Sequence, residues 1–497
     1  MLSALCLWAA FVVPHLYGVI FVALIPLLAV ITDLRPRQAF IVGFIGGAIF
    51  HALMNYWLVP TIIGLRERIG FGMSATVATA SATFLLLACY QGLFSGLFAA
   101  CLTWLRPSTA LLSIIIAALW TLMEWFRGLG PFGYPWADLV YSQTGSLPLL
   151  QISEWTGGYG VGFLIAGVNG LIWTAIKLRS GRLVVTALIL VGFWYGLGKV
   201  IMHQYRDAPD TLQVALVQSS ISVDEKRDQK NLLRSVNTHE ALSWQAERHG
   251  VEMIVWPESA LFTRFNEDVD LQFTIGDLAR ELGVPLLIGA LEGDRRGERL
   301  YNSCYVIDAR GKWTVVHQKG RLVPFGEYIP FERYMTFLRP IARATAHVSH
   351  GRKLMESEVA GRSIGVIICF ESMFPSIARR LTANGAQALV VITNDAWYGR
   401  TLAPHHHARM AVLRAVENRR SLARCANTGV TYFIDSLGRT GPALPLFTRG
   451  VVLGKIALTN SRTFYTRFGD WVVIVSGLLI AAIGANRCFV MWRRSWS

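Results

Sequence analysis

The sequence predicts a multi-pass α-helical membrane bundle joined to an α/β sandwich domain. Of the 497 residues, 53% are hydrophobic and only 16% are charged, whereas soluble domains usually carry about 25% charged residues. The shortage of charge is concentrated in residues 1–202 and 471–492. We therefore expect a transmembrane bundle of about seven helices at 1–202, a water-facing α/β domain at 203–468, and a C-terminal transmembrane helix with a short tail at 469–497.

The net charge of the chain is +15. A basic protein can bind nucleic acid, but no run of lysine and arginine with interleaved aromatic residues occurs here. We therefore expect no nucleic-acid partner. The same positive charge suits a protein that is embedded in a membrane of anionic lipid.

A helix that spans a bilayer needs about 20 mostly apolar residues. The stretches that meet or approach this length are 3–14, 16–32, 39–60, 75–104, 109–126, 157–176, 183–201 and 471–490. The first stretch is short and ends at Pro14. Residues 1–33 therefore form either one long helix kinked at Pro14 or two segments that turn there.

The distribution of basic residues between these stretches predicts the orientation of the bundle. Lysine and arginine are concentrated in alternate loops and at the end of the chain, at Arg35, Arg37, Arg106, Lys177, Arg179, Arg182, Arg487, Arg493 and Arg494. Because basic loops stay in the cytoplasm, both termini are expected to be cytoplasmic. Seven segments before residue 203 would then place the polar domain in the periplasm and the bundle in the bacterial inner membrane.

The segment 127–156 between two predicted helices is rich in tryptophan, tyrosine, glycine and proline. Such a segment can form an aromatic belt at the membrane interface. It can also re-enter the membrane and line a site that is open to lipid. The sequence leaves both interpretations open.

Within the polar domain, short apolar runs alternate with helical patterns. The runs expected to be buried strands are 212–218, 253–256, 285–289, 364–369 and 388–393. Helical patterns cover 230–250 and 271–282. A hairpin is expected at 301–308 and 312–318, since Gly311 supplies its turn. Strands that alternate with helices predict a layered α/β sandwich.

Three chemically distinctive side chains lie where predicted strands end. Glu258 follows the strand 253–256, Lys319 follows the hairpin, and Cys369 ends the strand 364–369. A rigid strand can aim such a side chain while the loop after it leaves the group accessible. Three of the seven cysteines lie in this domain without metal-ligand spacing, so at least one thiol is free. Each residue alone is more often structural, but together they predict a site with a base, a cation and a thiol.

The residues around these positions resemble those of a known family. WPES carries Glu258, KGRLVPFGEYIP carries Lys319 and Glu327, and CFES carries Cys369, which is similar to the Glu-Lys-Cys triad of the nitrilase superfamily. The LVPFGEYIP run more specifically resembles the apolipoprotein N-acyltransferase family. Further motifs of that family are ITNDAWYG at 392–399, ANTGVT at 426–431, EWFRG at 124–128, YPW at 134–136 and YSQ at 141–143. The likeness covers nearly the whole chain.

The resemblance implies a nitrilase-like αββα sandwich and an acyltransferase reaction. Glu258 would be the general base, Lys319 the cation that stabilises the oxyanion, and Cys369 the nucleophile that forms an acyl thioester. The residues expected to support them are Glu327, Glu371, Phe370 and Asn394. The implied substrates are a phospholipid acyl donor such as phosphatidylethanolamine, and the α-amino group of the diacylglyceryl cysteine of an apolipoprotein. No cofactor and no metal ion are expected.

The chain departs from the family pattern near the triad. His317 replaces a tyrosine and Arg321 replaces a histidine on either side of Lys319, and Phe370 replaces the tyrosine after the cysteine. Ser219 and its neighbour end a strand where the family has VQGN, and a nearby tryptophan has no clear counterpart. No triad residue is lost. The departures leave open a divergent paralogue with another acyl acceptor.

Two further segments allow more than one interpretation. Residues 329–346 carry apolar side chains among basic ones, at Phe331, Tyr334, Met335, Phe337 and Leu338. They form either an arm that dips into the membrane or a packed surface loop. The consecutive residues His405, His406 and His407 cannot all face one ion from a regular element, and no acid or cysteine accompanies them at ligand spacing. We therefore expect no metal site there.

Two other functions would use parts of the same pattern. A membrane-tethered amidase or nitrile hydrolase would use the same triad with water as the acceptor, but small polar amides do not require a multi-helix bundle. A transporter or assembly protein would keep a decayed enzyme domain. The intact triad argues against this second alternative, and so does the scarcity of intramembrane charge, since Glu124 and Glu154 lie near helix ends.

Overall fold

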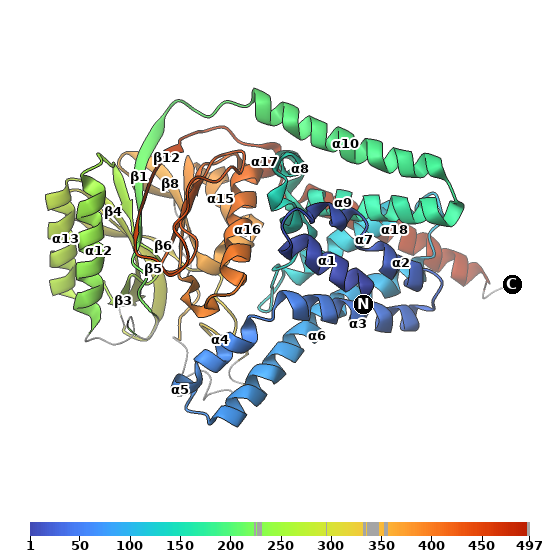
Figure 1. The fold of residues 1–497 in the computed structure, drawn as a ribbon, viewed down its shortest axis with the longest axis horizontal. Coiled ribbons are helices and arrows are strands. Elements are labelled where there is room, and N and C mark those ends of the chain that lie inside the picture. The colour runs from blue at the N-terminus through green and yellow to red at the C-terminus, as the bar shows by residue number, and fades with distance from the viewer. Residues whose placement is uncertain are drawn as a thin grey trace. The chain divides into compact units, whose positions relative to one another are not determined.

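The computed structural model describes residues 1–222, 225, 231–294, 296–331, 334, 347–351 and 356–494. Met335, Phe337 and Leu338 of the predicted arm lie outside these residues. The chain divides into two compact units (Figure 1). They are Met1–Ile63 with Met73–Tyr205 and Phe468–Ser497, and Gly64–Gly72 with Arg206–Arg467.

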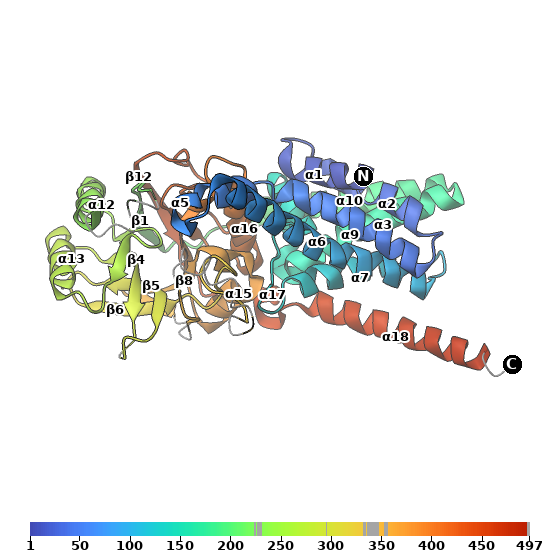
Figure 2. The same ribbon diagram turned by 90° about the horizontal axis from the view of Figure 1, so that it is seen from below.

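The first unit is helical, as two views show (Figures 1 and 2). Its elements are α1 (Leu2–Val12), η1 (Tyr17–Phe21), α2 (Ile25–Ile31), α3 (Pro36–Met54), α4 (Leu58–Gly64, whose last residue belongs to the other unit), α6 (Met73–Leu105), α7 (Leu112–Arg127), η2 (Leu139–Gly145), α8 (Leu147–Leu150), α9 (Ser153–Leu178), α10 (Gly181–Gln204) and α18 (Trp471–Arg494). Within the part of the chain that is described, 5 helices are long and apolar enough to cross a membrane, namely α3, α6, α9, α10 and α18.

The other predicted membrane segments correspond to shorter elements. They are α1, the η1–α2 pair and the 16-residue helix α7. The first helix ends at Val12, and Val13 is extended with φ −86° and ψ 120°, as expected for a residue that precedes proline. His15 then has a φ of 69°. Residues 1–33 therefore turn at Pro14 and do not form one long helix.

Helices α3 and α6 pack closely because glycines line their contact. A Cβ atom added to Gly43 would lie 2.6 Å from the carbonyl oxygen of Ser95, and one added to Gly47 would lie 2.5 Å from the Ser95 side chain. On the facing helix, a Cβ on Gly92 would lie 2.8 Å from the carbonyl oxygen of Phe44. Small residues spaced by four positions let two backbones approach, which is how helices associate in membranes.

The aromatic loop between α7 and α9 is packed inside the first unit. Its 3-10 helix η2 buries Leu139–Gln143, and Trp136 is 2% exposed. Arg127 at the end of α7 pairs with Asp138, which precedes η2. Most of the loop is thus buried within this unit, while Leu129 in the loop and Trp155 at the start of α9 remain exposed.

The second unit contains two β-sheets. The first has strand order β12-β1-β2-β4-β5-β6, with β3 also paired to β4, and the second has the order β11-β10-β9-β8-β7. The strands are β1 (Thr211–Gln218), β2 (Met253–Val255), β3 (Leu261–Arg264), β4 (Leu286–Gly293), β5 (Leu300–Ile307), β6 (Trp313–Gln318), β7 (Glu356–Val359), β8 (Arg362–Ile368), β9 (Ala388–Thr393), β10 (Leu422–Ala426), β11 (Tyr432–Ile434) and β12 (Gly450–Ala457). The helical elements are α5 (Arg66–Ile69), α12 (Leu232–Glu247), α13 (Val269–Leu282), η6 (Cys369–Met373), α15 (Pro375–Asn384), η7 (Asp395–Tyr398), α16 (Ala403–Asn418) and α17 (Phe464–Phe468).

Helices cover the outer faces of the two sheets, so the unit has four layers. Figure 1 shows α12 and α13 on one side of the strands and α15 and α16 on the other. The sheets meet face to face, since the Cys425 Sγ of β10 lies 3.3 Å from the carbonyl oxygens of Val217 in β1 and Val255 in β2. The predicted αββα sandwich is confirmed.

The predicted strands and the hairpin are present with small shifts at their ends. β5 and β6 pair antiparallel, as the turn at Gly311 predicted. The sequence reading missed β3, β7, β10, β11, β12, α15 and α16. Four of the missed strands carry charged residues, which obscure the apolar pattern that a buried strand is expected to show. They include Arg264 in β3, Glu358 in β7, Arg424 in β10 and Lys455 in β12.

Candidate active site

Three strand ends bring the predicted triad together. Glu258 lies three residues after β2, and Lys319 directly follows β6, so both extend from the first sheet. Cys369 follows β8 of the second sheet. All three residues are buried, with exposed fractions of 5%, 1% and 7%. The site therefore lies between the two sheets at one end of the sandwich.

Lys319 lies between two carboxylates. Its Nζ atom is 2.9 Å from Oε1 of Glu258 and 2.9 Å from Oε1 of Glu327. Glu327 is fixed in turn, because its Oε2 accepts a hydrogen bond of 2.8 Å from the Val323 backbone N–H. Burial by itself would lower the pKa of Lys319, but the two carboxylates raise it well above the ordinary value. The lysine is thus a permanent cation at this position.

Both oxygens of Glu258 are bonded. Oε1 accepts from Lys319 and also from the Asn302 side-chain amide at 2.8 Å. Oε2 accepts the backbone N–H of Asn394 at 2.8 Å. Because Asn302 lies in the first sheet and Asn394 follows a strand of the second, Glu258 is held from both sheets.

The Cys369 thiol is protonated in the resting site. Burial raises its pKa, the Glu258 carboxylate raises it further, and the Lys319 ammonium lowers it without reversing the outcome. The charges of both other triad residues thus act on the thiol. A buried thiol with a raised pKa needs a base to become a nucleophile. Glu258 is the carboxylate whose charge acts most strongly on it.

The conformation of Cys369 corrects one prediction. The sequence predicted that Cys369 ends the strand 364–369, but β8 ends at Ile368 and Cys369 begins η6 with a φ of 51°. This left-handed conformation is strained for a residue with a side chain. The reason is the sharp turn that redirects the chain from the strand into η6.

Glu371 ties the cysteine loop to the lysine loop. Its Oε1 accepts the Gly320 N–H at 2.7 Å, and its Oε2 accepts the Ile368 N–H at 2.9 Å and contacts His317 Nε2 at 2.7 Å. Burial opposes the charge of Glu371, but His317 and the backbone donors together lower its pKa. The carboxylate therefore stays ionised and joins the residues that flank Lys319 to those that flank Cys369.

The remaining predicted residues surround this core. The Arg321 guanidinium lies 4.9 Å from the ring centre of Phe374, and the Phe374 ring meets the Phe370 ring edge to face at 5.2 Å. Asn394 contributes its backbone N–H to Glu258, and its side chain accepts from Asn427 at 3.1 Å. The chain departs from the family pattern at His317 and Arg321, and both residues thus contact the loops of the site.

Sequence reasoning missed Asn302, His407 and Arg424 as residues of the site, whereas Asp395 lies in the ITNDAWYG motif that it identified. Asn302 was detectable as a polar residue inside the apolar strand β5. Asp395 and Arg424 are fully buried and joined at 2.9 Å, and His407 contacts Asp395 at 2.9 Å. Nothing in the local sequence of His407 distinguishes it from the two histidines before it.

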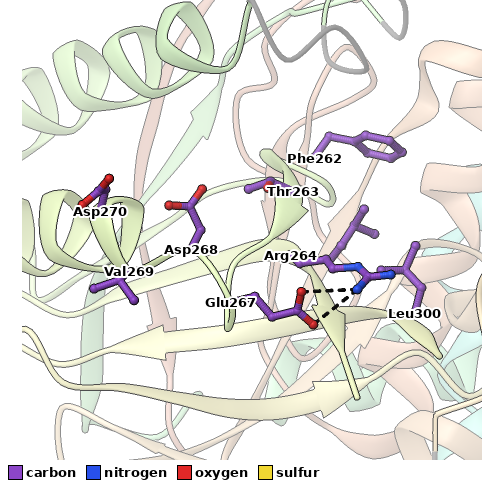
Figure 3. A pocket seen from close by; sticks show the side chains of 9 residues that line it. Phe262, Thr263, Arg264, Glu267, Asp268, Val269, Asp270 and Leu300 are labelled. Carbon is purple, nitrogen blue, oxygen red and sulfur yellow. Dashed lines mark hydrogen bonds and ion pairs between the residues drawn. The ribbon is translucent and has the colours of Figure 1, made fainter. Parts of the chain in front are cut away.

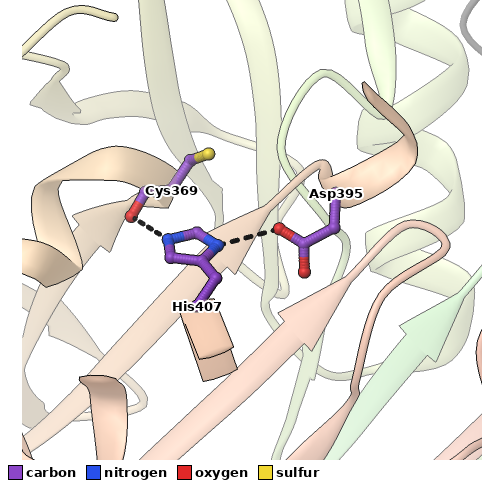
Figure 4. Close-up of side chains that lie close together, drawn as sticks. All are labelled: Cys369, Asp395 and His407. Carbon is purple, nitrogen blue, oxygen red and sulfur yellow. Dashed lines mark hydrogen bonds and ion pairs between the residues drawn. The ribbon is translucent and has the colours of Figure 1, made fainter. Parts of the chain in front are cut away.

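Cys369, Asp395 and His407 form a buried group in which one potential ligand atom from each residue lies within 4.8 Å of the others. Figure 4 shows the thiol pointing away from the imidazole, while the Cys369 carbonyl faces it. His407 Nδ1 contacts Asp395 Oδ1 at 2.9 Å, and Nε2 contacts the Cys369 carbonyl oxygen at 3.1 Å. Since hydrogen bonds engage both ring nitrogens, we assign no metal ion to this group.

A separate cavity of about 680 Å³ lies at the outer side of β3 (Figure 3). It is lined by Phe262, Thr263, Arg264, Glu267, Asp268, Val269, Asp270, Leu291 and Leu300. An ion pair of 3.2 Å joins Arg264 to Glu267 across it. No triad residue lines this cavity, so we assign it no part in the chemistry.

Both halves of the chain match known protein families. Residues 213–465 match the carbon-nitrogen hydrolase family, and residues 3–171 match the apolipoprotein N-acyltransferase N-terminal domain. The apolipoprotein N-acyltransferase of Geobacter metallireducens is 32% identical over 98% of this chain and 94% of its own length. That of Methylococcus capsulatus is 31% identical over 93% of this chain and 89% of its own.

Among solved structures, an amidase of the nitrilase superfamily from Nesterenkonia aligns with 54% of this chain and 94% of its own, at 18% identity and a TM-score of 0.38. The identities with the named relatives extend over both the membrane helices and the domain that holds Glu258, Lys319 and Cys369. The chain belongs to the apolipoprotein N-acyltransferase family.

Proposed function

We propose that this protein transfers a fatty acyl group from a phospholipid to the α-amino group of the diacylglyceryl cysteine that begins an apolipoprotein. The observation that carries the proposal is the buried ammonium of Lys319, held between Glu258 and Glu327 at 2.9 Å from each, with the Cys369 thiol in its field. Membership of the apolipoprotein N-acyltransferase family supplies the type of substrate.

In the first step, Glu258 takes the proton of the Cys369 thiol, and the sulfur attacks the ester carbonyl of the phospholipid. The negative charge that develops on the carbonyl oxygen is stabilised by Lys319, and removing one such donor typically costs about 3–4 kcal/mol of barrier. When the carbon–oxygen bond breaks, Glu258 returns its proton to the departing alcohol. The products are a lysophospholipid and an acyl thioester on Cys369.

In the second step, the lipoprotein amine attacks the thioester carbonyl. Glu258 accepts a proton from the amine and Lys319 again stabilises the oxyanion. Loss of the thiolate, which takes back the proton, releases the amide. Such a sequence predicts ping-pong kinetics. Glu327 and Asn302 support both steps, because they hold Lys319 and Glu258 in position.

The membrane helices give the site access to its substrates, since both the acyl donor and the acceptor reside in a bilayer. We place the bundle of residues 1–202 and the C-terminal helix in the bacterial inner membrane, with both termini in the cytoplasm. The domain at 203–468 then lies in the periplasm. The positive-inside distribution of arginine and lysine supports this orientation, and phosphatidylethanolamine is the proposed donor.

Phe331 and Tyr334 of the predicted arm at 329–346 are proposed to contact the membrane. Among its described residues, Phe331 is 57% exposed and Tyr334 is 69% exposed. Exposed aromatic side chains that are flanked by basic residues suit a lipid interface. They are unlike the side chains of a packed surface loop.

The test uses the purified full-length protein in vesicles of phosphatidylethanolamine with a synthetic diacylglyceryl lipopeptide. Intact-mass spectrometry should show one added acyl chain on the protein before the lipopeptide is supplied, and its transfer to the peptide amine afterwards. Cys369→Ala should lose both signals. Cys304→Ala is the matched control, since Cys304 is also a free buried thiol of the same unit and should retain both.

The alternatives give other results in the same assay. A hydrolase would discharge its acyl group to water at the same rate whether or not the lipopeptide amine is present. A protein that does not use this triad would acylate the lipopeptide normally after Cys369→Ala. The first result would overturn the proposed function, and the second would overturn the proposed role of Cys369 in it.

A further inference from the structure

The nucleophile stands in a conformation that its surroundings must maintain. Cys369 has a φ of 51°, in the left-handed region that residues with side chains rarely adopt. A strained residue of this kind persists only when neighbouring groups hold it. The question is therefore which groups hold the backbone of Cys369.

Two side chains hold the carbonyl group of Cys369. The Ser372 hydroxyl donates to it at 2.8 Å, and His407 Nε2 lies 3.1 Å from the same oxygen. Ser372 lies in the same short helix η6, whereas His407 comes from α16, far along the chain. The contact from α16 thus ties the strained turn to a separate and rigid element.

The imidazole of His407 is itself fixed. Its Nδ1 contacts Oδ1 of Asp395 at 2.9 Å, and that carboxylate accepts from Arg424 at 2.9 Å and from Thr393 at 3.0 Å. The side chains of His407, Asp395 and Arg424 are all 0% exposed. Burial opposes the charge of Asp395, but Arg424 and His407 together lower its pKa, so it remains an acceptor. His407 Nδ1 can donate to this carboxylate, and Nε2 lies 3.1 Å from both the Cys369 carbonyl oxygen and the Ser372 hydroxyl oxygen.

We propose that His407, oriented by Asp395, is a positioning residue that holds the backbone of Cys369 so that its thiol faces Glu258 and Lys319. The inference rests on the proposed role of Cys369 as the nucleophile. His407 does not touch the reacting atoms, because the sulfur points away from the ring (Figure 4). Its hydrogen bond acts on the carbonyl of Cys369, and through the backbone it sets the direction of the Cα–Cβ bond.

The test compares three substitutions of His407, which keep the donor at Nε2, keep the donor at Nδ1, or remove both. Glutamine places its amide nitrogen near the position of Nε2 and so preserves the bond to Cys369, whereas asparagine places it near Nδ1. Leucine removes both donors. His406→Gln is the matched control, since His406 is the preceding residue on α16 and is also buried.

Two readouts separate positioning from folding. The first is kcat and KM for lipopeptide acylation, and the second is the rate at which iodoacetamide alkylates Cys369, located by peptide mass mapping. We expect His407→Leu and His407→Asn to lower kcat and the alkylation rate by about 100-fold, the typical effect of a misplaced reacting group, with KM unchanged. His407→Gln should stay within about tenfold of the unmodified protein, and His406→Gln should match it.

The inference is overturned if His407→Leu alkylates and turns over at the normal rate, or if the glutamine and asparagine variants are equally impaired. Should the leucine variant fail to fold, as judged by its thermal unfolding, the glutamine–asparagine pair still decides. Failure of the proposed role of Cys369 as the nucleophile has a different signature. In that case Cys369→Ala would keep its acylation activity, while the alkylation rates of the His407 variants would still report on the position of the thiol.

Discussion

Two buried carboxylates, one in each unit, differ in their hydrogen bonds and ion pairs. Glu258 in the catalytic unit is 5% exposed and Glu124 in the helical unit is 2% exposed. Both oxygens of Glu258 are bonded, and one of them is paired with the Lys319 ammonium. Glu124 has no ion pair among the residues described, and its Oε2 has no hydrogen-bond partner there.

The hydrogen bonds to Oε1 of Glu124 explain why a carboxylate is buried in the helical unit. Oε1 accepts the Trp120 indole N–H at 2.9 Å and the Leu139 backbone N–H at 2.7 Å, so it anchors the loop that follows α7. Its other oxygen faces Gly162, where an added Cβ would lie 2.8 Å away. The comparison indicates that the carboxylate proposed for proton transfer has a cation beside it and hydrogen bonds to both oxygens. A carboxylate that anchors a loop needs only one satisfied oxygen.

The greatest loss of activity is expected when Glu258, the proposed general base, is replaced. Glu258→Gln keeps the shape of the side chain but cannot accept a proton, and it leaves Lys319 with one charged partner. General-base catalysis contributes about 10²–10⁴-fold, so the rate of lipopeptide acylation should fall by about 1,000-fold. Measuring kcat in phosphatidylethanolamine vesicles checks this. Retention of more than a tenth of the activity would show that another group takes the thiol proton.

A smaller effect is expected on the stability of the protein at low pH. It depends on a third buried carboxylate, Asp395, which is fully paired like Glu258. Its pKa is lower in the folded protein than the unfolded value of about 3.9. The contribution of Asp395 to stability is therefore complete above that value and is lost as the pH falls below it towards the folded pKa, by an amount on the order of 2 kcal/mol.

This pH dependence is measured as the thermal unfolding midpoint of the detergent-solubilised protein between pH 6 and pH 3. The unmodified protein should lose stability through this range. Asp395→Asn should start lower and lose less between the same two values. Parallel curves for the two proteins would mean that other carboxylates cause the acid sensitivity.

The smallest expected effect concerns Glu124. Glu124→Gln keeps the acceptor for Trp120 and Leu139, so acylation should remain within about twofold and stability within about 1 kcal/mol. Glu124→Ala leaves the two buried N–H donors without an acceptor, which costs about 1–3 kcal/mol. Thermal unfolding and kcat of both variants check this order. A large loss of activity in a stable Glu124→Gln protein would assign the carboxylate a chemical role and erase the contrast with Glu258.

The two-part architecture and the positions of the chemically distinctive residues could be predicted from the amino-acid sequence alone. The uneven distribution of charge separates helical and α/β regions, and the apolar runs before Glu258, Lys319 and Cys369 locate them at strand ends. Hydrophobic patterning and composition are local properties. Both can therefore be recognised from the sequence without any knowledge of the fold.

The groups that hold the triad in place could be identified only from the folded protein. The bond from the Asn394 N–H to Glu258 joins positions separated by 136 residues, and that from His407 to the Cys369 carbonyl joins positions separated by 38. The folded protein also shows that the chain turns at Pro14 and that Cys369 leaves the strand in a left-handed conformation. Contacts of this kind arise when two sheets pack face to face, and no periodicity along the chain records which residues will meet.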